Sequence, residues 1–289
     1  MAIVLGDNRY GKAEVRLVRV DRDIDPGADQ HGITDLNVSV ALSGDMADTH
    51  ESGANDKVLA TDTQKNTVFA FARDGIGAIE DFGLRLARHF VDSQPSIHRA
   101  RVRIEQFTWT RLGGHSFAGA GGGTRTAVVT YDGERSWAVS GLTDLTVLNS
   151  TDSEFWGFPR DQYTTLQETK DRILATAVNA TWRHTTTEGV DWDTSYDAAK
   201  QSLLDAFAGT YSYSLQQTLY AMGERVLTND PGVAEVRLSL PNKHHFLSDL
   251  SPFGLDNPGE VYYAADRPYG LIEGTVLRDD APPAGPAWD

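Results

Sequence analysis

The feature that most constrains the fold of this chain is an order of elements that occurs twice. Polar–apolar alternation predicts strands, and apolar residues at helical spacing predict helices. The first half gives strands at 14–17 and 36–42, helices at 63–72 and 79–90, and strands at 97–109 and 126–131. The second half gives strands at 137–147 and 173–182, helices at 194–207 and 215–226, and strands at 233–240, from 261 onward and at 271–277. This repeated order predicts an α+β chain of antiparallel sheets with helices on one face, divided into domains at 1–134 and 135–289.

Both halves carry a helix-start pattern at the same place. Thr61 precedes Gln64 by three residues, and Ser214 precedes Gln217 by three, which is the spacing of a capping box. A helix start exposes free backbone N–H groups and the positive end of the helix dipole, so each is a suitable seat for an anion. In the first strand the alternation slips at 18–20, which predicts either a bulge or a more buried strand end there.

Composition excludes several classes of function. The 289 residues include no Cys, which rules out disulfides, thiolate metal sites and a cysteine nucleophile. The net charge of −15 argues against nucleic-acid partners, so any anion site must be locally basic. No stretch has membrane-spanning length, and neither a signal peptide nor a Ser-Lys-Leu peroxisomal address is present, so we expect a cytoplasmic protein. The tail from Asp279 onward, rich in Pro and Ala, is predicted to be disordered.

Polar residues near the end of the second half form a candidate site. In an extended strand Asn242 and His244 share one face, where an amide and an imidazole can hold a small polar molecule and pass protons. The alternative is a strand end with a turn at Pro241 and solvated polar groups. Because His244 and His245 are neighbours on a strand, they point to opposite faces and cannot chelate one metal. The Gly-rich segment 119–123 lacks a phosphate-loop ending and predicts a flexible hairpin, and no dinucleotide fingerprint is present.

Several motifs in order resemble the urate oxidase (uricase) family, and the likeness covers nearly the whole chain, from Tyr10 to Ile272. They are Asn242-Lys243-His244, the run at 61–67, and the segment 145–182 with Phe155-Trp156-Gly157-Phe158 and Asp171-Arg172-Ile173-Leu174. The resemblance implies two tandem T-fold domains in a tunnel-shaped homotetramer. It also implies cofactor-free oxidation of urate by dioxygen and water to 5-hydroxyisourate and hydrogen peroxide, with no metal.

The resemblance assigns substrate-binding roles to residues that also have ordinary structural interpretations. Arg172 would hold the ionised purine, its alternative being a surface pair with Asp171 or Glu168. Phe155 would stack on the substrate ring, although it also suits a core aromatic. Gln216 offers a donor and an acceptor to the ring, and Leu215 a backbone N–H, whereas both also suit an ordinary helix start.

The same resemblance implies a proton relay of Lys12, Thr61 and His244. A lysine accepts protons only when burial or a nearby cation depresses its pKa. Otherwise Lys12 is a solvated strand residue and Thr61 an N-cap. By the resemblance Lys12, Thr61 and Asp62 come from one subunit, while Arg172, Gln216, Asn242 and His244 come from its neighbour.

Two rival functions remain open. A zinc-dependent purine or pterin hydrolase of the cyclohydrolase type shares the fold group, but it normally needs Cys and His ligands that this chain lacks. A non-catalytic purine- or pterin-binding T-fold protein would predict a damaged relay, whereas Lys12, Thr61 and His244 are all present.

Overall fold

The computed structural model describes residues 2–25 and 30–289 and forms two compact units. Unit 1 contains the described residues up to Gly141 together with Arg183–Thr194 and Pro282–Asp289. Unit 2 contains Leu142–Trp182 and Ser195–Ala281. The predicted T-fold domains at 1–134 and 135–289 stay a prediction. Among the described residues, no helix combines the length and apolar character needed to cross a membrane.

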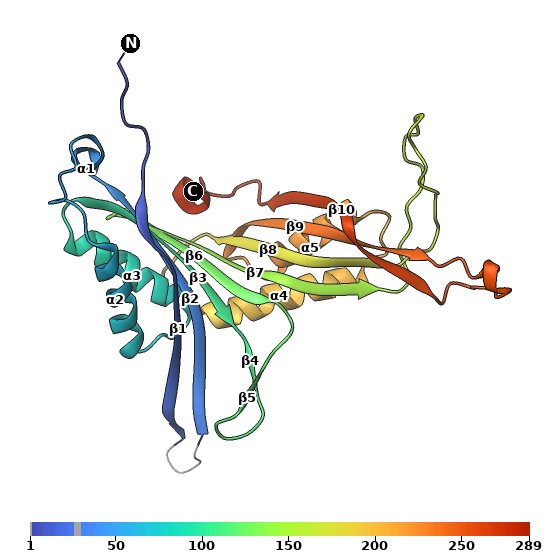
Figure 1. Cartoon of the computed structure of the whole chain (residues 1–289), viewed down its shortest axis with the longest axis horizontal. Coiled ribbons are helices and arrows are strands. Elements are labelled where there is room, and N and C mark those ends of the chain that lie inside the picture. Colours follow the sequence, from blue (N-terminus) through green and yellow to red (C-terminus); the bar gives the residue numbers. More distant parts are fainter. Residues whose placement is uncertain (1, 26–29) are drawn as a thin grey trace. The chain divides into compact units, whose positions relative to one another are not determined.

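Unit 1 is an antiparallel sheet with helices on one face (Figure 1). Its strands lie in the order β1-β2-β3-β6-β7, with antiparallel pairing of β1 with β2, β2 with β3, and β3 with β6. Their bounds are β1 Tyr10–Asp25, β2 Gln30–Gly44, β3 Ile97–Phe107, β6 Thr124–Tyr131 and β7 Ser136–Asn149. The helices are α1 Ala47–Glu51, α2 Thr61–Arg73 and α3 Ile79–Ser93. A small separate sheet pairs β4 Trp109–Arg111 with β5 Phe117–Gly119.

The core of unit 1 follows from the two periodicities in the sequence. Alternate residues of β2, from Leu36 to Leu42, are buried, because successive strand residues point to opposite faces. On α3, Phe82, Leu86 and Phe90 are fully buried at helical spacing, as predicted. These faces meet in one hydrophobic cluster, which explains why the helices cover only one side of the strands.

Unit 2 has the same layering and its own core (Figure 1). The later part of β7 continues into the order β7-β8-β9-β10. The bounds are β8 Leu174–His184, α4 Trp192–Gly209, α5 Leu215–Asn229, β9 Val233–Leu247 and β10 Tyr262–Leu277, with short 3₁₀ helices η1 Ser251–Phe253 and η2 Gly285–Trp288. Of these, η2, the last two residues of β8 and the first residues of α4 belong to unit 1. Leu219, Met222 and Val226 of α5 are buried in the core, as the helical spacing predicts.

The predicted bulge in the first strand is misplaced. Residues 18–20 pair regularly with β2, and the register instead shifts between Lys12 and Val15 and again between Asp21 and Asp25. Val18 and Val20 lie on the exposed face at 54% and 42% exposure, so the alternative of a more buried strand end is also wrong. Two exposed apolar residues broke the alternation in the sequence, although the backbone pairing there is regular.

Two further expectations are wrong. Gly119 ends β5, and 120–123 leads into β6, so the Gly-rich segment is not a hairpin turn. The tail is ordered: Ala287 is buried, Arg183 donates to the carbonyl of Pro282 at 3.0 Å, and Asp289 pairs with Arg99 at 3.2 Å.

A strained backbone position occurs within a strand of each unit. Glu14 in β1 has φ 56°, and Asp144 in β7 has φ 59°, values that side chains other than Gly rarely adopt. The backbone N–H of Glu14 donates to Ser39 Oγ at 3.0 Å, and that of Asp144 donates to Asn179 Oδ1 at 3.1 Å. Each unit therefore holds a left-handed residue in place with a side chain from another strand of that unit.

Candidate active site

In unit 2 the predicted aromatic platform is held by its backbone. Phe155 and Thr169 exchange two backbone hydrogen bonds of 2.9 and 3.0 Å, which form an isolated antiparallel bridge. The Phe155 ring is half-buried, and the ring of Phe158 stacks on it with centroids 5.0 Å apart. The backbone of Phe155 is therefore fixed, while the residue stays partly accessible to a ligand.

Arg172 lies beside that ring. Its guanidinium carbon is 5.3 Å from the Phe155 ring centroid, and its Nε–H donates to Ser153 Oγ at 3.1 Å. Burial lowers the pKa of Arg172 from its ordinary value. Among the described residues, no carboxylate lies at ion-pair distance from Arg172, so the alternative of a surface pair with Asp171 or Glu168 is wrong. A half-buried cation without a counter-ion is suited to an anionic ligand.

Asn242 and His244 lie two residues apart in β9, which continues through Pro241 without a turn. Both are half-buried, and the His244 ring stacks on Phe246, which confirms that alternate residues here share a face. Burial, then the positive charge of Arg172 and then His245, lower the pKa of His244. His244 is therefore neutral at neutral pH, with one ring nitrogen able to accept a proton.

The start of α5 completes the predicted set in unit 2. Ser214 is the N-cap, and its hydroxyl accepts the N–H of Gln217 at 3.2 Å, as predicted. Gln217 Oε1 reaches back to the N–H of Tyr213 at 2.8 Å. In the described chain the backbone N–H groups of Leu215 and Gln216 have no protein partner, and the Gln216 side chain is exposed. They remain available to a ligand, as at other helix starts.

In unit 1 the predicted residues lie on β1 and at the start of α2, which pack together. Lys12 is half-buried beside the bulge, and adjacent Gly11 approaches β2 so closely that a Cβ there would lie 1.8 Å from the carbonyl oxygen of Val40. Asp62 pairs with Lys65 at 2.5 Å. That contact, and more weakly Asn66 and the charge of Lys12, lower the pKa of Asp62. Lys12 and Asp62 therefore lie within electrostatic reach of one another.

Thr61 does not cap α2, contrary to prediction. Ala60 occupies the N-cap position without a side-chain hydrogen bond, and Thr61 is the first helical residue. Gln64 is fully buried and donates to the carbonyl of Leu59 at 3.2 Å instead of closing a capping box. In the part of the chain that the structure describes, the Thr61 hydroxyl has no hydrogen-bond partner, and its side chain is exposed.

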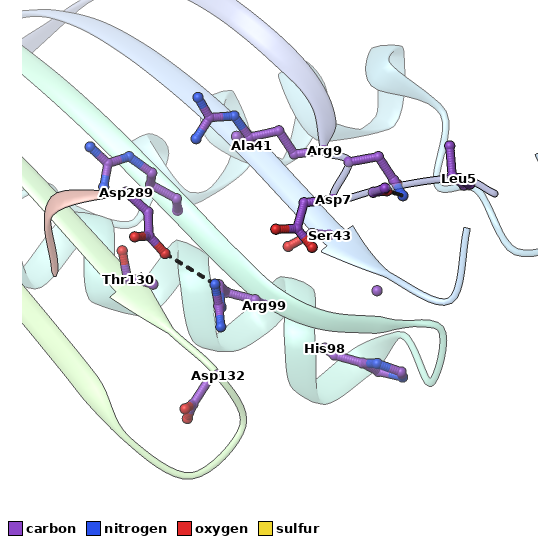
Figure 2. A pocket seen from close by; sticks show the side chains of 14 residues that line it. Leu5, Asp7, Arg9, Ala41, Ser43, His98, Arg99, Thr130, Asp132 and Asp289 are labelled. Atoms are coloured by element: carbon purple, nitrogen blue, oxygen red, sulfur yellow. Dashed lines mark hydrogen bonds and ion pairs between the residues drawn. The ribbon is translucent and has the colours of Figure 1, made fainter. Parts of the chain in front are cut away.

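A cavity of about 1040 Å³ in unit 1 contains none of the predicted site residues (Figure 2). Arg9, Arg99 and Arg101 line it together with three carboxylates, and Arg99 is paired with Asp289. The opposed charges leave little net attraction for an anion, so we place the candidate site elsewhere. No group of three or more potential metal-ligating side chains occurs within residues 2–25 and 30–289.

Comparison with known proteins identifies the family of this chain. The sequence profile of the family described as Uricase matches residues 8–132 and 138–273. The chain belongs to the uricase family. It is 53% identical to the uricase of Arthrobacter globiformis over 288 residues, covering 99% of this chain and 94% of the relative. It is 38% identical to the uricase of Aspergillus flavus, covering 93% and 95%.

The fold agrees as well. The crystal structure of uricase from Arthrobacter globiformis matches with a TM-score of 0.94 at 52% identity, over 100% of this chain and 99% of that one. An α+β chain with a large antiparallel sheet and covering helices is therefore the uricase fold, as the sequence predicted. The role of each predicted residue within that fold stays a prediction.

Sequence reasoning missed the residues that support the platform. Ser153 receives the Nε–H of Arg172, while Glu154 accepts from Trp156 Nε1 at 2.9 Å. Lys170 lies 3.0 Å from the centre of the Trp156 ring. A serine and a glutamate beside an aromatic pair have no distinctive spacing, so only the fold reveals these contacts.

Proposed function

We propose that this chain oxidises urate with dioxygen and water to 5-hydroxyisourate and hydrogen peroxide, without a cofactor. The observation that carries the proposal is the grouping of Arg172, Phe155 and His244 in unit 2. The desolvated Arg172 cation, which has no counter-ion among the described residues, lies against an aromatic ring, and burial followed by this positive charge lowers the pKa of the His244 imidazole. Membership of the uricase family supports the same reaction.

Binding in this proposal uses complementary hydrogen bonds and stacking. Arg172 faces the ionised edge of the purine, and the Gln216 amide pairs with an adjacent N–H and C=O. The ring lies on Phe155, and the free N–H of Leu215 supplies a further donor. Asp62 contacts the substrate from the other part of the site.

The chemistry is proton removal followed by electron transfer to dioxygen. Lys12, Thr61 and His244 take a further proton from the bound monoanion, which makes the ring electron-rich enough to reduce dioxygen directly. The free Thr61 hydroxyl and the neutral His244 ring fit this role, because each has capacity to accept and pass on a proton. Asn242 and Thr61 hold first dioxygen and then water above the ring. Water attack then gives 5-hydroxyisourate after peroxide has left.

We also propose that the two T-fold domains assemble into a tunnel-shaped homotetramer with sites at subunit interfaces. Lys12, Thr61 and Asp62 belong to one subunit, and the remaining site residues to its neighbour. An exposed apolar surface on the β9–β10 hairpin supports this assembly, because its side chains are between 48% and 75% accessible. Monomeric soluble proteins rarely expose so many apolar side chains in one region. The exposed side chains are Phe246, Leu247, Phe253, Leu255, Val261, Tyr263, Tyr269 and Leu271.

The test is a direct assay on chelator-treated protein. Urate absorbance in the ultraviolet is followed in air together with peroxide release, and the molar mass is measured under the same conditions. We expect one peroxide per urate consumed, and activity that elutes with the tetramer. Urate left intact would overturn the reaction, and activity from a stable monomer would overturn the shared site.

The non-catalytic purine- or pterin-binding alternative is separated by the same assay. It predicts that urate binds, as measured by equilibrium dialysis, while neither urate loss nor peroxide is detected. No contact in the described residues favours it over the catalytic proposal.

A further inference from the structure

Ser153 is joined to Arg172 in two ways. The backbone N–H of Arg172 donates to the carbonyl of Ser153 at 2.9 Å, and its side-chain Nε–H donates to Ser153 Oγ at 3.1 Å. Ser153 is fully buried, so water cannot replace its hydroxyl as the acceptor without moving the chain. One residue therefore fixes both the backbone and the side chain of Arg172.

We propose that Ser153 is a positioning residue that sets the guanidinium plane of Arg172 for the anionic substrate. This rests on the proposed function. A guanidinium donates through Nε and through two terminal Nη groups in one plane. Because Nε donates to Ser153, the guanidinium plane cannot rotate freely. The two Nη groups make no hydrogen bond to another described residue, so they stay available to a ligand.

Ser153 is an uncharged acceptor, which matters for the charge of Arg172. A carboxylate at this place would orient Arg172 equally well, but it would also neutralise the cation and compete with the substrate. A hydroxyl accepts the Nε–H without adding charge. The result is an oriented cation whose full charge remains for an anionic ligand, in a place where burial strengthens electrostatic attraction.

Ser153 is in turn tied to the start of α5. It forms a parallel bridge with Ser212, and the N–H of Glu154 donates to the Ser212 carbonyl at 2.8 Å. Ser212, also fully buried, donates to the carbonyl of Ser214 at 3.1 Å and accepts from Thr218 Oγ1 at 2.9 Å. These hydrogen bonds therefore fix the position of the Arg172 guanidinium relative to the start of α5, which carries Leu215 and Gln216.

The first test is kinetic. Ser153→Ala should raise the KM for urate by about tenfold, the size expected for losing one hydrogen bond to a charged group, while kcat falls by less than about threefold. A KM within twofold of the parent would overturn the proposal.

A double-mutant cycle separates positioning from general damage. Lysine has no Nε–H for Ser153 to hold, so Ser153→Ala in an Arg172→Lys background should raise KM no further. An equal rise in both backgrounds would mean that Ser153 acts through general packing, and the proposal would fail.

The control is another buried serine of unit 2. Ser202 in α4 is 2% exposed, donates to the carbonyl of Ala198 at 2.7 Å and accepts from Asn229 at 2.9 Å, and neither partner is a candidate site residue. Ser202→Ala should lower stability about as much as Ser153→Ala but leave KM unchanged. A matching rise in KM would show that the effect reports stability.

Crystal structures keep the inference testable even if urate is not the substrate. In Ser153→Ala the guanidinium of Arg172 should rotate or become disordered relative to the parent, while the Phe155–Thr169 bridge is kept. An unmoved guanidinium overturns the positioning role. If the parent protein does not consume urate but the guanidinium moves in Ser153→Ala, the proposed function is refuted and the positioning role stands.

Discussion

The starts of α2 and α5 occupy the same place in the repeated element order but are built differently. At α5 the Ser214 hydroxyl caps the helix, and the first free donors are backbone N–H groups. At α2 the cap position holds Ala60, and the Thr61 hydroxyl has no internal partner within the described residues. A hydroxyl used for capping contributes to stability, whereas a free one can serve chemistry. In the proposed mechanism the two starts therefore divide these tasks.

The largest effect is expected from the free hydroxyl and its lysine. Thr61→Ala and Lys12→Met should each lower kcat by about 10²- to 10⁴-fold, because each removes a group of the proposed proton relay. Steady-state kinetics with urate measures this, and circular dichroism checks that the fold is intact. Unchanged turnover in both variants would contradict the proposed relay. It would also show that the difference between the two helix starts has no role in catalysis.

A second effect concerns the cation in unit 2. Burial and, after it, the charge of Arg172 lower the pKa of His244, so Arg172→Gln should raise that pKa toward its ordinary value. The acidic limb of the pH profile of kcat/KM should then move to higher pH, and KM should rise by about 10- to 100-fold. A limb that stays in place, or moves to lower pH, would show that Arg172 does not act on His244.

A third effect concerns how much each helix start contributes to the free energy of unfolding. Ser214→Ala should lower the free energy of unfolding by about 1 kcal/mol, the usual contribution of a side-chain cap. Thr61→Ala should change it by less than about 0.5 kcal/mol, because an exposed side chain without partners contributes little. Urea unfolding of both variants gives the comparison, and equal losses would mean that Thr61 also supports its helix.

The smallest effect concerns the paired left-handed residues. Glu14→Gly should stabilise the chain by up to about 1 kcal/mol, because Gly adopts positive φ without strain, although its greater freedom in the unfolded chain offsets part of the gain. Asp144→Gly should change less, since Asp tolerates this conformation better. Thermal unfolding of the two variants measures the difference, and a larger gain at Asp144 would contradict this account.

Periodicity predicted the elements, because burial imposes it directly: Leu36 to Leu42 alternate, and Phe82 to Phe90 follow one helix face. It also placed Asn242 and His244 on one face of β9. It failed where tertiary contacts override local pattern. Gln64 is drawn into the core and cannot close the box with Thr61.

The platform beside Phe155 was beyond sequence reasoning for a related reason. The acceptor for Arg172 lies 19 residues earlier in the chain, not among its acidic neighbours Asp171 and Glu168. The Phe155–Thr169 bridge and the hydrogen bond from the Arg172 N–H to the Ser153 carbonyl bring these segments together. Such pairings follow from the fold and leave no local signature.

The discontinuity of unit 1 has a consequence for synthesis. A nascent chain that has emerged only as far as Gly141 lacks Trp192, which belongs to the core of unit 1, and Asp193, which pairs with Arg125 at 2.6 Å. Arg125 also pairs with fully buried Glu80 at 2.9 Å. On the ribosome, the first unit therefore cannot complete its interior until the Leu142–Trp182 segment of the second has been translated. A recombinant fragment cut at this point would expose that unfinished interior to aggregation.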